Sequence, residues 1–192
     1  MRKSIRSTQP PEEFRYQAEI LPPEEEQDLV AHIRELPLKE FEFHGYVGKR
    51  RTISYGWHYD FGQERLQQTE EIPSFLRKAR EYAAAFAGLA PGDLPHVLVT
   101  EYSPGTTIGW HRDKGVFDDV VGISLLSPCI FRLRRKTGSA WERFSLTVAP
   151  RSAYLLRGAA RTEWEHSIPA VDALRYSITF RSLRSKRGES KP

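Results

Sequence analysis

The sequence contains a single cysteine, Cys129, so no disulfide can form within the chain and no cysteine-based zinc site can be built. It also lacks any apolar run long enough to cross a membrane. The first residues are charged and contain proline, without the apolar core of a signal peptide. These absences predict a cytoplasmic protein that is not membrane-bound. Any metal ion must be held by histidine and carboxylate side chains.

The composition is that of an ordinary folded domain. Hydrophobic residues make up 39% of the 192 positions and charged residues 28%, a balance at which a chain of this length can bury a core. The net charge of +4 permits a polyanionic partner such as nucleic acid, although a solvated basic surface would give the same value. Nothing in the sequence requires an obligatory protein partner.

The hydrophobic pattern divides a single domain, 1–192, into two parts. Within 14–90, apolar residues recur at helical spacing after Pro22-Pro23 and again between Pro73 and Gly88. From residue 96 to 184, short runs rich in β-branched and aromatic residues follow one another at intervals of about ten residues. We therefore predict an α+β, mainly β fold, in which two N-terminal helices pack on a C-terminal β-sandwich or barrel.

Two potential metal ligands, His111 and Asp113, are separated by one residue. On an extended segment such residues point to the same side, so both can reach one ion. Two histidines and one carboxylate form a triad that holds Fe(II) and leaves coordination positions open. We predict His166 as the third ligand, with His58 as the alternative. On its own a His-x-Asp sequence is common, and a surface or capping His–Asp pair would be the better explanation of it.

Two arginines, Arg175 and Arg181, lie in a run where Tyr176, Ile178 and Phe180 alternate with polar residues. On a strand, both arginines would share one face. Inside a small barrel that face would be a buried cationic wall, which is costly unless an anion pairs with it. Guanidinium groups bind carboxylates bidentately. A dicarboxylate bound across this wall, with its keto acid end on the metal, would remove the cost.

These segments resemble the AlkB-type Fe(II)/2-oxoglutarate dioxygenases. Leu174–Arg181 is similar to the family's C-terminal segment Arg-Tyr-Asn-hydrophobic-Thr-Phe-Arg, with Ser177 in place of the usual Asn. The order of His-x-Asp, a distant His and two arginines also matches. Thr100–Gly105 resembles the family's Asn-x-Tyr segment, with Thr100 where Asn is common. The resemblance covers about 97–183.

The resemblance implies a fold, cofactors and residue roles. The fold would be a double-stranded β-helix, a jelly-roll variant, over 96–184, with 14–90 supplying buttressing helices and a substrate lid. His111, Asp113 and His166 would bind Fe(II). Tyr102 and Arg175 would bind the distal carboxylate of 2-oxoglutarate with help from Ser177, and Arg181 would support the end nearer the metal. With O2, the reaction would give succinate, CO2 and a hydroxylated or demethylated product.

The resemblance also implies a substrate. Family members cover a nucleobase with an N-terminal hairpin, and Gly45–Phe61 has that position here. Its cationic and aromatic side chains could contact phosphates and bases; the candidates are Arg50, Arg51, Tyr55, Trp57 and Tyr59. We expect alkylated single-stranded DNA or RNA as the partner. DNA-repair members commonly place an acidic residue where this chain has Gly115, so a protein side chain or a modified RNA base is the alternative substrate. A third possibility is an inactive nucleic-acid-binding module.

Overall fold

The computed structural model describes residues 4–43, 46–60 and 65–184, and the surroundings of side chains within 7–40, 49–57 and 67–184. The described helices are α1 (Pro23–Arg34), α2 (Arg77–Ala87) and the short α3 (Gly158–Thr162), with 3-10 turns at Ser74–Leu76 and Pro91–Asp93. The described strands are β1 (Ser4–Arg6), β2 (Phe14–Gln17), β3 (Lys39–Phe43), β4 (Tyr46–Tyr55), β5 (Trp57–Asp60), β6 (Arg65–Gln68), β7 (His96–Tyr102), β8 (Ile108–His111), β9 (Phe117–Leu125), β10 (Cys129–Thr137), β11 (Ala140–Val148), β12 (Ala153–Leu156), β13 (Glu165–Ile168) and β14 (Arg175–Leu183).

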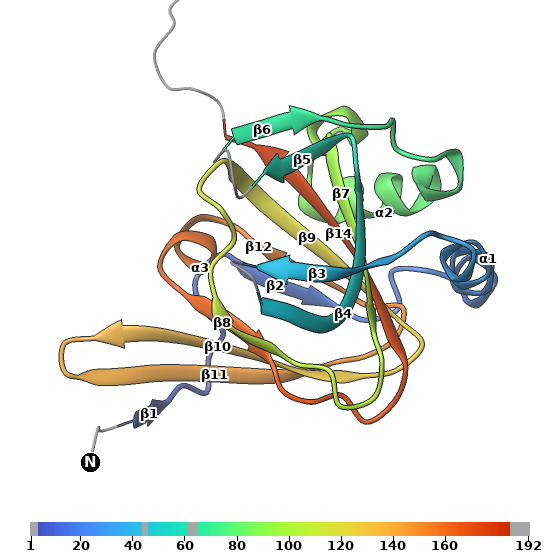
Figure 1. The fold of residues 1–192 in the computed structure, drawn as a ribbon. Helices are drawn as coiled ribbons and strands as arrows, with labels where there is room; N and C mark the ends of the chain where they lie inside the picture. The colour runs from blue at the N-terminus through green and yellow to red at the C-terminus, as the bar shows by residue number, and fades with distance from the viewer. Residues whose placement is uncertain (1–3, 44–45, 61–64, 185–192) are drawn as a thin grey trace, which may run out of the picture.

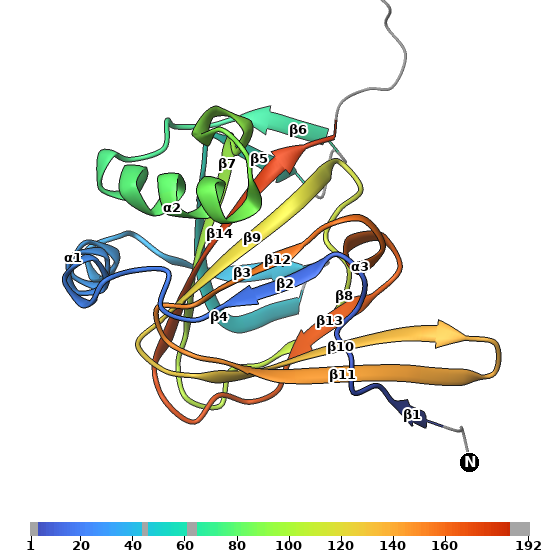
Figure 2. The same cartoon turned by 180° about the vertical axis from the view of Figure 1, so that it is seen from behind.

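Two sheets make the body of the molecule (Figure 1). The larger has the strand order β2-β12-β9-β14-β7-β4-β3, and the smaller has the order β1-β11-β10-β13-β8. Apart from the parallel β1–β11 contact, neighbouring strands are antiparallel. This arrangement is the predicted mainly β, double-stranded β-helix, and α1 and α2 lie on the outer side of the larger sheet in both views (Figures 1 and 2).

The larger sheet buries a different set of side chains on each face. Its outer face packs against α1 and α2 through residues such as Val99, Ile178 and Phe180, each 0% exposed. Its inner face and the smaller sheet enclose a second core, in which Phe131 and Tyr154 stack at 4.5 Å. Alternate residues of one strand therefore serve the helix layer and the barrel interior.

The helix boundaries follow from their terminal residues. In α1, proline is in the first turn and is followed by three glutamates, which suit the positive end of the helix dipole. In α2, the helix ends at Gly88, whose φ of +69° is the left-handed conformation that favours glycine, and its N–H bonds back to Ala84 and Ala85. The start of α1 and the end of α2 were both predicted from the sequence. The start of α2 differs, because a 3-10 turn follows Pro73 before the helix begins.

The N-terminal part, 14–90, supplies strands β2, β3 and β4 to the larger sheet as well as helices, so it is continuous with the β-core. Two features differ from the sequence prediction. The apolar alternation predicts strands only over 130–134 and 144–148, because the residues nearer the hairpin tip are polar, whereas β10 and β11 continue to that tip. The same alternation predicts a strand over 163–168, whereas β13 begins at Glu165 and helix α3 precedes it.

Within the described residues, no helix is both long and apolar enough to span a membrane.

Candidate active site

Two histidines face each other across neighbouring strands of the smaller sheet. His111 on β8 is the register partner of His166 on β13, and their ring centroids are 4.2 Å apart. The Nδ1 of His111 lies 2.9 Å from the carbonyl oxygen of Gly109. A carbonyl can only accept a hydrogen bond, so Nδ1 carries the proton and Nε2 keeps its lone pair. That tautomer is the one a metal ligand needs.

Asp113 follows β8 by two residues and brings a carboxylate to the same place. Its side chain is 7% exposed, and its Oδ2 lies 3.6 Å from Nε2 of His166. Its Oδ1 accepts two hydrogen bonds from Arg181, from Nε at 2.9 Å and from Nη2 at 2.7 Å. Its Oδ2 is buried and has no hydrogen-bond partner among the described residues. A buried carboxylate oxygen without a partner is costly, and a bound cation would satisfy it.

The charge states of the three residues suit a divalent cation. Burial, together with the neighbouring His111, lowers the pKa of His166 to about 3, and burial also lowers the pKa of His111. Burial opposes ionisation of Asp113, but the positive charge of Arg181 holds its pKa below the ordinary range. Near neutral pH the site therefore offers two neutral imidazoles and a carboxylate, the states in which these groups bind metal.

The three side chains contact one another as two pairs, His111 with His166 and His166 with Asp113. In the described part of the chain, no group of three or more His, Cys, Asp and Glu side chains already has the arrangement of a metal site. The double hydrogen bond to Arg181 accounts for the orientation of the Asp113 carboxylate. The donor set itself, two imidazoles and one carboxylate, is the one that suits non-haem Fe(II).

Arg175 lies at the opposite end of the predicted arginine wall, on β14. It is 1% exposed, its Nε donates to Ser124 Oγ at 3.0 Å, and its guanidinium lies 4.8 Å from the centre of the Tyr102 ring. Its Nη1 is buried without a hydrogen-bond partner in the described structure. An unsatisfied guanidinium donor in a closed interior fits a carboxylate ligand. Tyr102 is 3% exposed and borders the same space.

Ser177 is part of a row of three hydroxyl groups that crosses the inner face of the larger sheet. It pairs in register with Thr100 on β7 and with Ser124 on β9. The three residues are at most 3% exposed. Residues directly opposite in antiparallel strands point to the same side, so the row lines the interior next to Arg175. The sequence pointed to Ser177 but not to Ser124, although the small residues Gly122 and Ser124 interrupt the apolar pattern of β9.

Tyr154 on β12 closes the floor of this interior. A Cβ atom on Gly122 would lie 2.3 Å from Tyr154 Cζ, so the ring rests directly on the glycine backbone. Burial raises the pKa of the Tyr154 hydroxyl, and the charges that act on it include Arg175 and Asp113. Tyr154 is thus placed between the two ends of the site. No sequence pattern marked it, because an aromatic residue in a buried strand is most often core.

A third residue that the sequence did not indicate is Arg161 on α3. It is 4% exposed, and its Nη2 donates to the backbone oxygens of Lys114 at 2.5 Å and Phe117 at 3.0 Å. These bonds hold the loop that carries Asp113 from β8 to β9. In the sequence, Arg161 could have been noticed as a charged residue that follows small apolar residues just before the strand of His166.

Three of the predicted lid residues, Arg50, Arg51 and Tyr55, lie on β4 and divide between the two faces of the larger sheet. Arg51 pairs with Glu101 on the helix side, through two hydrogen bonds of 2.8 Å, and Tyr55 is 5% exposed in the core beneath the helices. Both were predicted as substrate contacts, and both point away from the histidines. The reason is the strand period of two, which sends alternate residues to opposite faces.

Arg50, by contrast, lies on the interior side. The groups that act on it electrostatically include Tyr102, Arg181 and Asp113, and burial lowers the pKa of its guanidinium. Trp57 is half-buried at the start of β5. Tyr59 and the alternative ligand His58 lie on the same strand, and their side chains are outside the described part of the structure. Arg50 is thus the predicted lid residue that the described structure brings next to the metal-ligand candidates.

Comparisons with known proteins bear on the family and the fold of this chain. Residues 13–181 match the model of the 2OG-Fe(II) oxygenase superfamily. The bovine alpha-ketoglutarate-dependent dioxygenase alkB homolog 7, mitochondrial, is 34% identical over 165 residues, which cover 75% of this chain and 72% of the relative. The human alkB homolog 4 is 27% identical, over 86% of this chain and 65% of the relative.

Two further matches bear on length and fold. The alkylated DNA repair protein ALKBH8 homolog of Arabidopsis thaliana is 30% identical over 164 residues, 72% of this chain. This chain spans about half the length of that relative, since the match covers 47% of it. The solved structure of OsALKBH1 superposes with a TM-score of 0.64 at 16% identity and covers 88% of this chain and 96% of that one. At this identity the likeness shows the fold.

Proposed function

Because this chain belongs to the 2OG-Fe(II) oxygenase superfamily and to its AlkB-like dioxygenases, we propose that it oxidatively removes N-alkyl groups, such as methyl, from nucleic acid bases. The family implies Fe(II), 2-oxoglutarate and O2 as the reacting partners. The observation that carries the proposal is a pair of buried polar atoms without hydrogen-bond partners among the described residues, Asp113 Oδ2 and Arg175 Nη1. The first suits a metal ion and the second a carboxylate.

We assign iron binding to His111, Asp113 and His166. The assignment is supported by the proton that His111 keeps on Nδ1 and by the depressed pKa values of both histidines. Arg181 orients Asp113 through Oδ1, which leaves Oδ2 for the metal. Such outer partners commonly change metal affinity or activity by about 10–100-fold when removed.

We assign the distal carboxylate of 2-oxoglutarate to Arg175, with Tyr102 beside it and Ser177 in the adjoining hydroxyl row. Arg181 supports the end of the cosubstrate nearer the metal. Buried arginines are costly without anions, so a dicarboxylate would stabilise this interior as well as bind to it. Phe131 and Tyr154 stack to form an aromatic floor beside the same space.

When bound, Fe(II), O2 and 2-oxoglutarate supply the oxidation: 2-oxoglutarate loses CO2 and takes one oxygen atom to become succinate, and the other oxygen atom enters a substrate C–H bond. An N-methyl group becomes an N-hydroxymethyl group, which releases formaldehyde and leaves N–H on the base. Within the chain, Arg175 and Arg181 fix the cosubstrate. Arg50, on the interior side of β4, is placed to contact the anionic substrate.

The nucleic acid substrate is supported by two observations of different kinds. One relative carries the name of an alkylated DNA repair protein, and this chain spans part of its length. The other is the cationic interior at Arg50. A second candidate is the same chemistry on a protein side chain or a modified RNA base. It is favoured by Gly115, an exposed residue that offers no acidic contact two positions after Asp113.

The test is a coupled assay of succinate and formaldehyde. Purified protein is incubated with Fe(II), ascorbate and labelled 2-oxoglutarate, with and without an N-methylated single-stranded oligonucleotide. We expect oligonucleotide-stimulated succinate and an equal amount of formaldehyde, both lost in His111→Ala and Arg175→Ala. Arg157→Ala is the matched control, since Arg157 pairs with Asp119 and is not one of the assigned ligands.

The outcomes separate chemistry from substrate. Succinate that no methylated DNA or RNA stimulates would overturn the nucleic acid substrate and favour the protein side chain. No succinate from metal-loaded protein would overturn the oxygenase assignment and favour an inactive binding module.

A further inference from the structure

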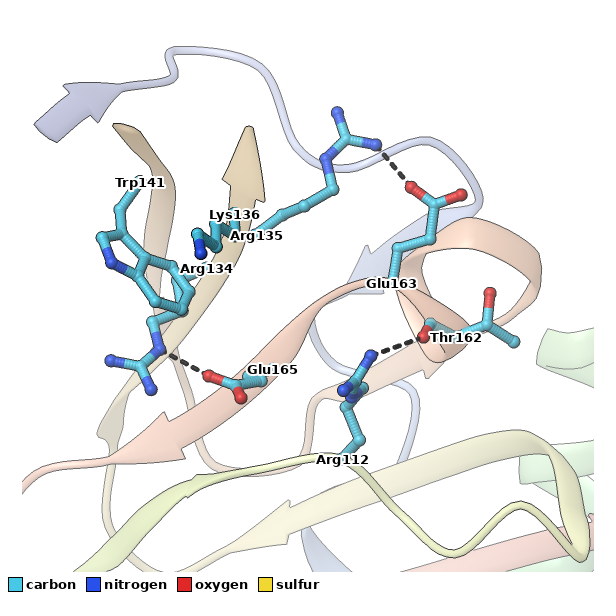
Figure 3. A pocket seen from close by; sticks show the side chains of 8 residues that line it. All are labelled: Arg112, Arg134, Arg135, Lys136, Trp141, Thr162, Glu163 and Glu165. Atoms are coloured by element: carbon cyan, nitrogen blue, oxygen red, sulfur yellow. Dashed lines mark hydrogen bonds and ion pairs between the residues drawn. The ribbon is translucent and has the colours of Figure 1, made fainter. Parts of the chain in front are cut away.

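A cationic and aromatic face lies on the outer side of the strands that hold the two histidines. Arg112 and Trp110 flank His111 in sequence, and Arg134, Lys136, Trp141 and Arg143 come from the β10–β11 hairpin; we call these six residues the β10 face. With Thr162, Glu163 and Glu165 nearby, part of this face lines a hollow of about 480 Å³ (Figure 3). The hairpin projects beyond the barrel at the end where β8 and α3 lie, in both views (Figures 1 and 2).

The centre of the β10 face is an arginine held between two indole rings. The guanidinium of Arg134 lies 4.4 Å from the centre of the Trp110 ring and 4.3 Å from that of Trp141. Its Nε donates to Glu165 at 2.6 Å. The guanidinium of Arg132 also lies near this stack, 5.0 Å from the centre of the Trp110 ring. Stacking fixes the guanidinium plane, so less side-chain entropy is lost when its outer N–H groups bind an anion.

The charges of this face do not cancel. The acids beside it are used by two arginines: Glu165 pairs with Arg134, and Glu142 and Glu163 both pair with Arg135. Arg112 donates only to the backbone oxygen of Thr162. For Lys136 and Arg143, the described structure contains no acidic partner. Among the described residues, three cations of the β10 face therefore remain without an acidic partner.

The pairing of the hairpin strands makes this excess costly. Arg134 is the register partner of Arg143, so two guanidinium groups project from directly opposite positions on one face. Like charges directly opposite in an antiparallel pair destabilise it. A solvated hairpin would be better stabilised by an acid at either position. An anion bound on this face would offset the repulsion.

We infer that the β10 face binds the sugar-phosphate backbone of single-stranded nucleic acid next to the base that enters the active site. Arginine binds phosphate oxygens bidentately, and tryptophan rings provide stacking surfaces for bases. An acidic peptide would use the cations but gain little from the indoles. The hollow is large enough for a nucleotide unit. This inference rests on the proposed nucleic acid substrate and specifies where the strand is held outside the catalytic interior.

The test measures the affinity of the holoprotein for labelled oligothymidylate and oligouridylate by fluorescence anisotropy, without O2 so that no turnover occurs. We compare wild type with Lys136→Ser/Arg143→Ser at several salt concentrations. Arg143→Ser alone is matched by Arg77→Ser, which removes one exposed arginine from α2. We expect the double variant to bind at least about tenfold more weakly and its salt slope to fall by about 1.4, from roughly 0.7 per phosphate contact.

If Arg143→Ser has the same affinity and salt slope as Arg77→Ser, the inference is overturned. Tighter binding of a polyglutamate peptide than of either oligonucleotide, lost in the double variant, would also overturn it and assign the face to an acidic protein. The proposed function fails separately. Methylated oligonucleotide that is demethylated by wild type, with unchanged binding in the double variant, leaves the function and removes the inference. If binding is lost in the double variant but wild type demethylates nothing, the binding face stands and the proposed function is overturned.

Discussion

Arg181 donates both Nε and Nη2 to one oxygen of Asp113, Oδ1, over 2.9 and 2.7 Å. The other oxygen, Oδ2, faces His166 at 3.6 Å. One arginine of the cosubstrate wall is therefore the residue that orients a candidate iron ligand. Loss of Arg181 should affect the metal as well as the cosubstrate.

Arg181→Lys should weaken metal binding by about 10–100-fold, because lysine cannot reproduce the two hydrogen bonds that Nε and Nη2 of Arg181 donate to Asp113 Oδ1. Titration of the protein with Mn(II), which is stable in air, measures this in a calorimeter. Arg157→Lys is the control, since Arg157 makes a similar double contact with Asp119, at 2.9 and 2.6 Å. Equal affinities in the two variants would show that Asp113 does not depend on Arg181.

Gly122→Ala should raise the KM for 2-oxoglutarate. The added Cβ would lie 2.3 Å from Tyr154, so the ring must move toward the space that we assign to the cosubstrate. Overpacking of this kind typically costs about 1–3 kcal/mol, and a binding loss of that size corresponds to about 5–150-fold. Gly92→Ala is the control, because its Cβ would meet nothing within 4 Å. An unchanged KM would place the cosubstrate away from Tyr154.

Metal-free protein should lose stability as the pH falls from about 7 to about 5. The ordinary pKa of histidine is 6.5 and that of folded His166 is about 3, so between these values the unfolded chain binds the extra proton. Stability then falls with pH, by roughly 2 kcal/mol at pH 5 for this one group. Asp113 does not titrate in this window, since its pKa lies below the ordinary value of 3.8.

Urea unfolding at the two pH values measures this loss. His166→Gln should lose less stability than wild type over the same interval, whereas His32→Gln, at a side chain 50% exposed on α1, should behave like wild type. A wild-type loss that persists in full in His166→Gln would mean that other groups cause it.

The neighbouring residues Arg50 and Arg51 should give opposite results. Arg50→Ala should raise the KM for a methylated oligonucleotide, because Arg50 faces the interior beside Asp113. Arg51→Ala should leave that KM unchanged and cost up to about 1 kcal/mol, because it removes a half-exposed ion pair with Glu101. Steady-state kinetics and thermal unfolding of both variants would reveal a reversed result.

The parts of this structure that the sequence predicts are those with a strict period. The alternation of Tyr176, Ile178 and Phe180 with polar residues predicts β14 and places both arginines on one face, as observed. The spacing of His111 and Asp113 predicts a shared direction for the same reason. The family, the mainly β fold, and the dependence on Fe(II) and 2-oxoglutarate that the family implies are likewise confirmed.

The lid could not be resolved from sequence because it depends on register. A shift of one residue exchanges the faces of a strand, and the β3–β4 pairing contains an irregularity between Glu40 and Phe41. Aromatic and basic content therefore marked Arg51 and Tyr55 as well as Arg50, although only Arg50 faces the interior. Ser124, Tyr154 and Arg161 were missed because their roles depend on contacts between segments that are distant in the chain.

Strand β14 has consequences for how the protein tolerates substitution. The run from Arg175 to Phe180 is buried at every position, with one set of residues facing the interior site and the other packed under the helices. Neither set can vary freely, since one is needed for binding and the other for the core. A random change within 175–180 therefore meets no neutral position, and chance mutation in this part of β14 should often abolish the protein.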